Sequence, residues 1–89
     1  MYELEISEKL RKILKRLFKK DRVRYEATLK KINEVINGKP NHYKNLSYDM
    51  KEFKRVHIDS HFVLIFKVDE NKKIIRFEDL QHHNHIYRR

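Results

Sequence analysis

The chain has no cysteine, a single glycine and a single proline among its 89 residues. Without cysteine it can form neither disulfides nor thiolate metal sites. With one glycine and one proline it has almost no linker or low-complexity sequence. No run approaches the roughly 18 to 20 apolar residues that a membrane span requires, and charges interrupt the first apolar positions, unlike a signal peptide. We therefore expect a cytoplasmic protein with no membrane partner.

The composition of the chain is typical of a folded protein and carries a strong positive charge. Hydrophobic residues make up 39% and aromatic residues 11%, which suits one small domain over residues 1–89. The formal net charge is +9 and the sequence pI is near 9.9. Such a balance points to nucleic acid, an acidic protein partner, or both. The alternative is that a Lys-rich and Glu-rich surface only keeps a small or thermophilic protein soluble.

Two helices are predicted between residues 7 and 38. Ser7 and Asp21 can each cap a helix N-terminus, and Gly38 followed by Pro40 is typical of a helix end. Apolar residues recur at intervals of three and four, which places them on one face of each helix. They are Leu10, Ile13, Leu14, Leu17 and Phe18 in the first helix, and Tyr25, Leu29, Ile32 and Ile36 in the second. We expect an antiparallel helical hairpin.

Four strands are predicted around these helices from alternating or continuous apolar residues. They are expected over residues 2–6, 53–59, 61–68 and 73–80, with a loop over 39–52 and a turn at 69–73. The unbroken run Phe62–Phe66 indicates a central strand that is covered on both faces. In the last strand, Ile75 and Phe77 should face one way while Arg76 and Glu78 face the other. The order β-α-α-β-β-β predicts an α+β domain, with the helical hairpin packed on one face of a mainly antiparallel four-stranded sheet.

Titratable side chains gather after the last predicted strand. His82, His83 and His85 lie within four residues of one another, and Tyr87 follows them. Imidazole and phenol groups can transfer protons, and histidine does so near neutral pH. In a basic protein we expect a polyanion to meet them. Proton transfer beside a basic surface is the chemistry that a ribonuclease needs.

The element order and several short segments resemble the RelE/ParE toxin superfamily, in particular RelE-like chains of the YafQ branch. The segments are Arg55-Val56-His57-Ile58, the strand 62–68, Arg76-Phe77-Glu78 and His83–Tyr87. The resemblance covers essentially the whole chain and is most specific over residues 53–68 and 75–87. It implies a RelE-like fold and a type II toxin that cleaves mRNA in the ribosomal A site. It also implies partners: ribosome-bound mRNA, ribosomal RNA, and an acidic, partly disordered RelB-like antitoxin that can join the toxin in a heterotetramer.

The resemblance also implies roles for individual residues. His57 and His83 fall on active-site histidines of that branch, and Tyr87 falls on its terminal aromatic residue. Phe62 matches an aromatic residue that follows an acid in that branch, whereas here the preceding residue is His61. Lys44 lies near a position that holds a histidine there, and His42 could take that position if the loop shifts by two residues.

The chemistry of RNA cleavage without a metal ion fits these residue types. One group removes the proton of the attacking 2′-oxygen, a second protonates the 5′ leaving oxygen, and a cation stabilises the phosphorane. Arg55 and His57 lie two residues apart on one strand, so their side chains should share a face. We assign catalysis to Arg55, His57, His83 and Tyr87. We assign substrate contacts to Lys44, Lys54, His61, Phe62, Arg76, His82 and His85.

The same residues allow other interpretations. His82, His83 and His85 could bind a metal ion, but structural zinc usually recruits cysteine, and adjacent His82 and His83 are expected on opposite sides of a strand. We therefore expect no metal and no cofactor. Two other functions stay open: a ParE-like toxin that poisons DNA gyrase, and a non-enzymatic basic module that binds RNA or the ribosome. The clustered imidazoles argue against a pure binding poison.

Overall fold

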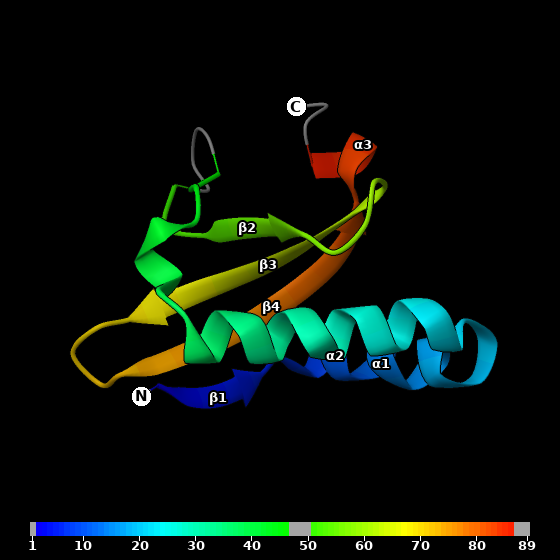
Figure 1. Ribbon diagram of the computed structural model, residues 1–89, viewed down its shortest axis with the longest axis horizontal. Coiled ribbons are helices and arrows are strands. Elements are labelled where there is room, and N and C mark those ends of the chain that lie inside the picture. Colours follow the sequence, from blue (N-terminus) through cyan, green and yellow to red (C-terminus); the bar gives the residue numbers. More distant parts are fainter. Residues whose placement is uncertain (1, 47–50, 87–89) are drawn as a thin grey trace.

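The computed structural model describes residues 2–46 and 51–86, and for residues 85 and 86 it describes the backbone only. The helices are α1 (Glu8–Lys20), α2 (Arg22–Asn37), the 3-10 helix η1 (Pro40–His42) and α3 (His83–Ile86). The strands are β1 (Glu3–Ile6), β2 (Lys54–His57), β3 (Phe62–Asp69) and β4 (Ile74–His82). They form one sheet in the order β1-β4-β3-β2, in which β1 is parallel to β4 and the other pairs are antiparallel. Figure 1 shows α1 and α2 side by side across one face of this sheet. The predicted α+β architecture is confirmed.

Both long helices begin at the predicted capping residues. The Ser7 hydroxyl accepts a hydrogen bond from the Leu10 backbone N–H at 3.0 Å. The Asp21 carboxylate accepts one from the Arg24 backbone N–H at 3.1 Å. Each cap satisfies a helix N–H group that has no partner within the helix, and such a side chain contributes about 1 kcal/mol. Among the described residues, no helix has the length and apolar character needed to cross a membrane.

The helices and the sheet enclose the main core, and three of the four apolar residues predicted for α2, Tyr25, Ile32 and Ile36, reach this core. Leu29 was expected to be buried and is 39% exposed, whereas Thr28 and Val35 are fully buried. The Thr28 hydroxyl donates to the Arg24 carbonyl at 2.8 Å, so it is satisfied within its own helix. A polar residue that is buried in this way is invisible to a pattern built from apolar residues alone.

The central position of β3 is confirmed. Leu64 and Phe66 pack in the core beneath the helices. Val63 and Ile65 lie in a second cluster with Leu46 and Phe53 on the other side of the strand. The segment predicted only as a loop over 39–52 therefore supplies cover for the face of the sheet that the helices leave open.

A β-bulge interrupts the alternation of β4. Phe77 pairs with Phe66 and Asp79 pairs with Ile65, so Glu78 is an extra residue in this strand. The extra residue explains why Ile75, Phe77 and then Leu80 all reach the same core. Side chains beyond the bulge cannot be assigned to a face by extending the pattern from Ile75. The strand also runs two residues further than predicted, to His82.

Candidate active site

Three chain segments converge where β2 ends, β3 begins and β4 passes into α3. Phe62 pairs with His82 across the two central strands, and His57 pairs with Val63. The His83 backbone N–H donates to the His61 carbonyl at 2.7 Å, which ties α3 to the β2–β3 connection. In Figure 1, α3 and this connection lie together at the same end of the sheet. The sheet pairings thus gather histidines that are far apart in the sequence.

Four imidazoles and one phenyl ring form the cluster at this end of the sheet. The ring centroids of His57 and His83 are 6.3 Å apart. Those of His61 and His82 are 5.8 Å apart, and the Phe62 ring meets His82 edge-on at 5.4 Å. We call these five residues the histidine cluster. It brings together the two histidines to which proton transfer was assigned.

His82 and His83 do not face opposite sides, so that prediction was wrong. Because β4 ends at His82 and α3 begins at His83, strand alternation stops between them. Their rings stack with an interplanar angle of 15° and centroids 5.8 Å apart. The Asn84 backbone N–H donates to His82 Nδ1 at 3.2 Å, so a neutral His82 carries its proton on Nε2.

Arg55 shares the face of β2 that carries His57, as predicted. Their partners on β3 are Ile65 and Val63, which both belong to the second hydrophobic cluster, on the side of the sheet away from the helices. The Arg55 backbone N–H donates to the Lys44 carbonyl at 3.0 Å, which places the main chain of Lys44 beside this strand. Arg55 is partly buried, whereas His57 and Lys44 are exposed.

Lys54 does not join the histidine cluster. It precedes Arg55 on β2, so its side chain points to the other face of the sheet. Its ammonium donates to the Tyr43 carbonyl at 3.2 Å and to Asn45 Oδ1 at 2.9 Å. These bonds hold Lys54 against the 43–45 segment.

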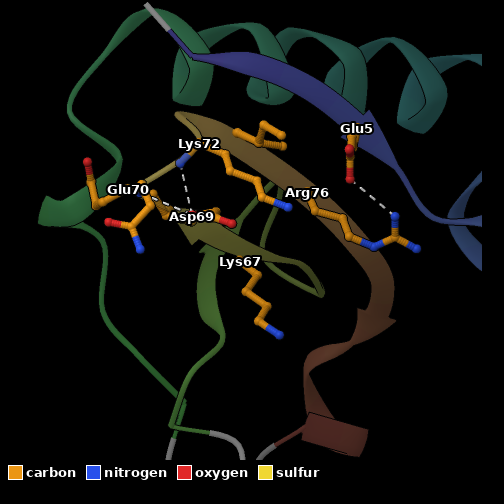
Figure 2. Close-up of a pocket in the computed structure, with 9 residues that line it drawn as sticks. Glu5, Lys67, Asp69, Glu70, Lys72 and Arg76 are labelled. Carbon is orange, nitrogen blue, oxygen red and sulfur yellow. Dashed lines mark hydrogen bonds and ion pairs between the residues drawn. The ribbon is translucent and has the colours of Figure 1, made fainter.

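Arg76 also lies apart from the cluster. It precedes His82 by six positions along β4, a separation of about 20 Å at the rise of an extended strand. Its guanidinium pairs with Glu78 at 3.0 Å and with Glu5 at 3.4 Å. Figure 2 shows it in a hollow at the β3–β4 turn, among side chains of both signs. The labelled residues there are Glu5, Lys67, Asp69, Glu70, Lys72 and Arg76.

This hollow lacks groups suited to proton transfer near neutral pH. No histidine is among the residues that line it. Hydrogen bonds from Asn41, Tyr2 and Lys73 lower the pKa of Glu70 to about 2. Asp69 accepts the backbone N–H groups of the turn that follows it, at 3.0 and 3.1 Å. The histidine cluster is therefore the better candidate for an active site.

Sequence reasoning missed two residues beside the cluster, Arg24 and Asp59. The Arg24 guanidinium lies 4.1 Å from the centroid of the Phe62 ring, and its Nε is 3.2 Å from Asp59 Oδ2. Asp59 Oδ1 accepts the backbone N–H groups of His61 and Phe62 at 2.8 and 2.9 Å. Partial burial raises the pKa of Asp59, but these backbone bonds and Arg24 outweigh it and lower the pKa below its ordinary value.

Two predicted site residues, Tyr87 and His85, have side chains outside the part of the chain that the structure describes. Tyr87 is outside the described residues, and of His85 only the backbone is described, as part of α3. Among the side chains that are described, no group of three or more histidine or carboxylate residues is arranged to hold a metal ion.

Comparison with known proteins decides the family. A family model described as "ParE toxin of type II toxin-antitoxin system, parDE" matches residues 4–87. The chain belongs to the RelE/ParE toxin superfamily. It is accordingly the toxin of a type II toxin–antitoxin system.

Relatives support this assignment at the level of sequence and fold. The toxin is 51% identical to "Putative toxin RelE4" of Methanocaldococcus jannaschii, over 100% of this chain and 94% of that protein. The Escherichia coli YafQ structure has a TM-score of 0.66 at 21% identity and covers 98% of this chain and 99% of its own. The YoeB–YefM complex of Staphylococcus aureus has a TM-score of 0.75 at 11% identity, over 93% and 98%. At these identities the two structures show a shared fold.

Proposed function

We propose that this toxin is a ribosome-dependent endoribonuclease that cleaves mRNA in the A site without a metal ion. The observation that carries the proposal is the placement of His83 against His57, with ring centroids 6.3 Å apart. Two groups that can exchange protons near neutral pH are thereby close enough to contact one scissile phosphate. The net charge of +9 draws the RNA backbone toward them. Cleavage on the ribosome places its action in the cytoplasm.

The proposed reaction needs only side chains of this chain and the 2′-hydroxyl of the RNA. One imidazole accepts the 2′ proton as the 2′-oxygen attacks the adjacent phosphorus. The other imidazole donates a proton to the 5′-oxygen, which leaves as a hydroxyl and leaves a cyclic phosphate behind. Arg55, on the same face as His57, offers its guanidinium to the negative charge of the phosphorane. Both histidines are required, because one proton is taken and another is given in the same step.

A gyrase-poisoning toxin is the second candidate, because the matching family model carries the ParE name. Such a toxin binds its target and transfers no proton. It gives no role to the contact between His57 and His83. A DNA supercoiling assay with purified gyrase separates the two functions.

Expression of the toxin without its antitoxin is expected to stop translation and growth, because translated messages are cleaved. Primer extension should find new 5′ ends inside codons. A message whose start codon has been removed is the matched control and should stay intact, since cleavage depends on the ribosome. Normal growth with intact messages at high expression contradicts the proposal. Growth arrest with intact messages and lost supercoiling supports the second candidate.

We further propose that an acidic, partly disordered RelB-like antitoxin covers the basic side of α1 and blocks the route to the histidine cluster. The exposed cations of this helix are Arg11, Lys12, Lys15, Arg16, Lys19 and Lys20. Beside them is a hollow with an apolar floor that includes Ile6, Leu14, Phe18 and Tyr25. The positively charged rim of this hollow would attract acidic side chains, and its apolar floor would accept the apolar face of the same amphipathic segment. The YoeB–YefM complex of Staphylococcus aureus shares the fold and supports a protein partner. We also propose that the toxin and its antitoxin assemble as a heterotetramer.

The association rate of toxin and antitoxin is expected to fall steeply as salt rises, because the Debye length shortens from about 30 Å at 0.01 M to about 3 Å at 1 M. Stopped-flow measurements give the salt dependence. Reversing Lys15 and Lys19 to glutamate should flatten it, whereas Lys72→Glu, at the exposed β3–β4 turn, should flatten it less. A salt-independent association rate speaks against electrostatic steering.

A further inference from the structure

Arg24, in the first turn of α2, uses both the edge and the face of its guanidinium. Nη1 is 2.7 Å from Asp21 Oδ2, and Nε is 3.2 Å from Asp59 Oδ2. The flat face lies over the Phe62 ring, with Cζ 4.1 Å from the ring centroid. One side chain therefore joins the start of α2 to the β2–β3 connection and to the first residue of β3.

The connection that Arg24 holds leads directly to the catalytic histidines. The Asp59 carboxylate that it pairs with also receives the backbone N–H groups of His61 and Phe62. From there one path runs through the His61 carbonyl, which accepts the His83 N–H at 2.7 Å. The other path runs through the Phe62 ring, which meets His82 edge-on at 5.4 Å, and His82 stacks on His83.

We propose that Arg24 is a positioning residue of the toxin, which fixes His83 against His57 by holding the Asp59 turn and the Phe62 ring. The inference rests on the proposed cleavage by these two histidines. Arg24 does not serve as a phosphate ligand, because two carboxylates already pair with its single charge. Its planar fork is what the role requires, since an ammonium group offers no flat face to Phe62.

The test compares Arg24→Gln with Arg22→Gln in single-turnover cleavage on programmed ribosomes. Arg22 is a close control, because it lies two residues away and its guanidinium stacks on Phe18 at 3.9 Å, away from the cluster. Arg24→Gln should lower the rate at saturating ribosome concentration by about 10- to 100-fold, as expected when a catalytic group is displaced by about 1 Å. The half-saturating concentration should change little. Arg22→Gln should stay within about twofold of the unmodified toxin on both measures.

A second measurement separates this inference from the proposed function. Histidine ring signals in the NMR spectrum of the free toxin, together with the nuclear Overhauser contact between Phe62 and His82, report the geometry without any cleavage. Arg24→Gln should shift the His82 and His83 signals and weaken that contact, and Arg22→Gln should not. If the unmodified toxin does not cleave mRNA, the proposed function fails, while these spectra still show whether Arg24 positions the cluster.

Three results overturn the positioning role. The first is an unchanged rate with unchanged histidine signals in Arg24→Gln. The second is a raised half-saturating concentration at an unchanged rate, which makes Arg24 an RNA-binding residue. The third result concerns Arg24→Lys, which is tested if Arg24→Gln does not fold. This variant keeps a charge beside Asp59 but loses the flat face over Phe62, so the proposal expects it to cleave more slowly than the unmodified toxin. An unaltered rate and unaltered His82 signal in Arg24→Lys then reject the proposal.

Discussion

Replacing His83 by alanine is expected to slow mRNA cleavage by about 10²- to 10⁴-fold, the usual effect of losing a general acid or base. The same loss is expected for His57→Ala, because the proposed reaction uses both imidazoles, whose ring centroids are 6.3 Å apart. Tyr87→Ala should also have a large effect, since the family resemblance places Tyr87 at the terminal aromatic position. Single-turnover cleavage on programmed ribosomes measures each rate, and circular dichroism checks that each variant is folded.

His82→Ala is the matched control for His83→Ala and should cost only a few-fold in rate. The two residues are adjacent and their rings stack, so both substitutions remove an imidazole from the same cluster. The difference is that the ring of His83 meets His57, whereas that of His82 meets Phe62 and His61. If His82→Ala cripples cleavage while His83→Ala is nearly silent, the roles assigned to the two residues are reversed.

Features of the fold that depend on local chemistry could be predicted from the sequence. Ser7 and Asp21 predict the starts of the two helices, because a capping side chain accepts a hydrogen bond from a backbone N–H only three residues further along the chain. The β-bulge at Glu78 could not be predicted, because it is set by the pairing of β4 with β3. Because of this extra residue, counting along β4 assigns the side chains after Glu78 to the wrong face of the sheet.

In the candidate site too, features set by neighbouring residues could be predicted, whereas contacts between distant residues could not. Arg55 and His57 could be placed on one face because residues two apart on a regular strand share a face, and β2 pairs with β3 in an unbroken register. The same rule, applied to Lys54, separates it from that face. The contact between Arg24 and Asp59 joins residues 35 positions apart. Arg24 is one of 22 lysines and arginines, and nothing in the local sequence singles it out.

Replacing Phe66 by alanine is expected to lower the free energy of unfolding by about 3–5 kcal/mol, the usual cost of removing a buried aromatic ring. Phe66 is fully buried, and its ring centroid lies 5.6 Å from that of Tyr43 and 5.5 Å from that of Phe77. β3 pairs with a strand on each side, so the cavity left by the missing ring would be enclosed by its neighbours. Small domains are stable by about 5–15 kcal/mol, so this one change removes a large share.

Denaturant unfolding measures the loss, with Phe18→Ala as the control. Phe18 is the same residue type but is 46% exposed, with its ring packed edge-on against Tyr25 at 5.2 Å. Removing it should cost about 0.5–1.5 kcal/mol, the range for an aromatic pair. Equal losses for the two variants would show that the β3 core is not the main source of stability. Phe66 lies four positions along β3 from Phe62, about 13 Å at the rise of an extended strand, so the folded fraction of Phe66→Ala should still cleave mRNA at a rate close to normal. A slow rate in the folded fraction would instead mean that this core also sets the spacing of the catalytic histidines.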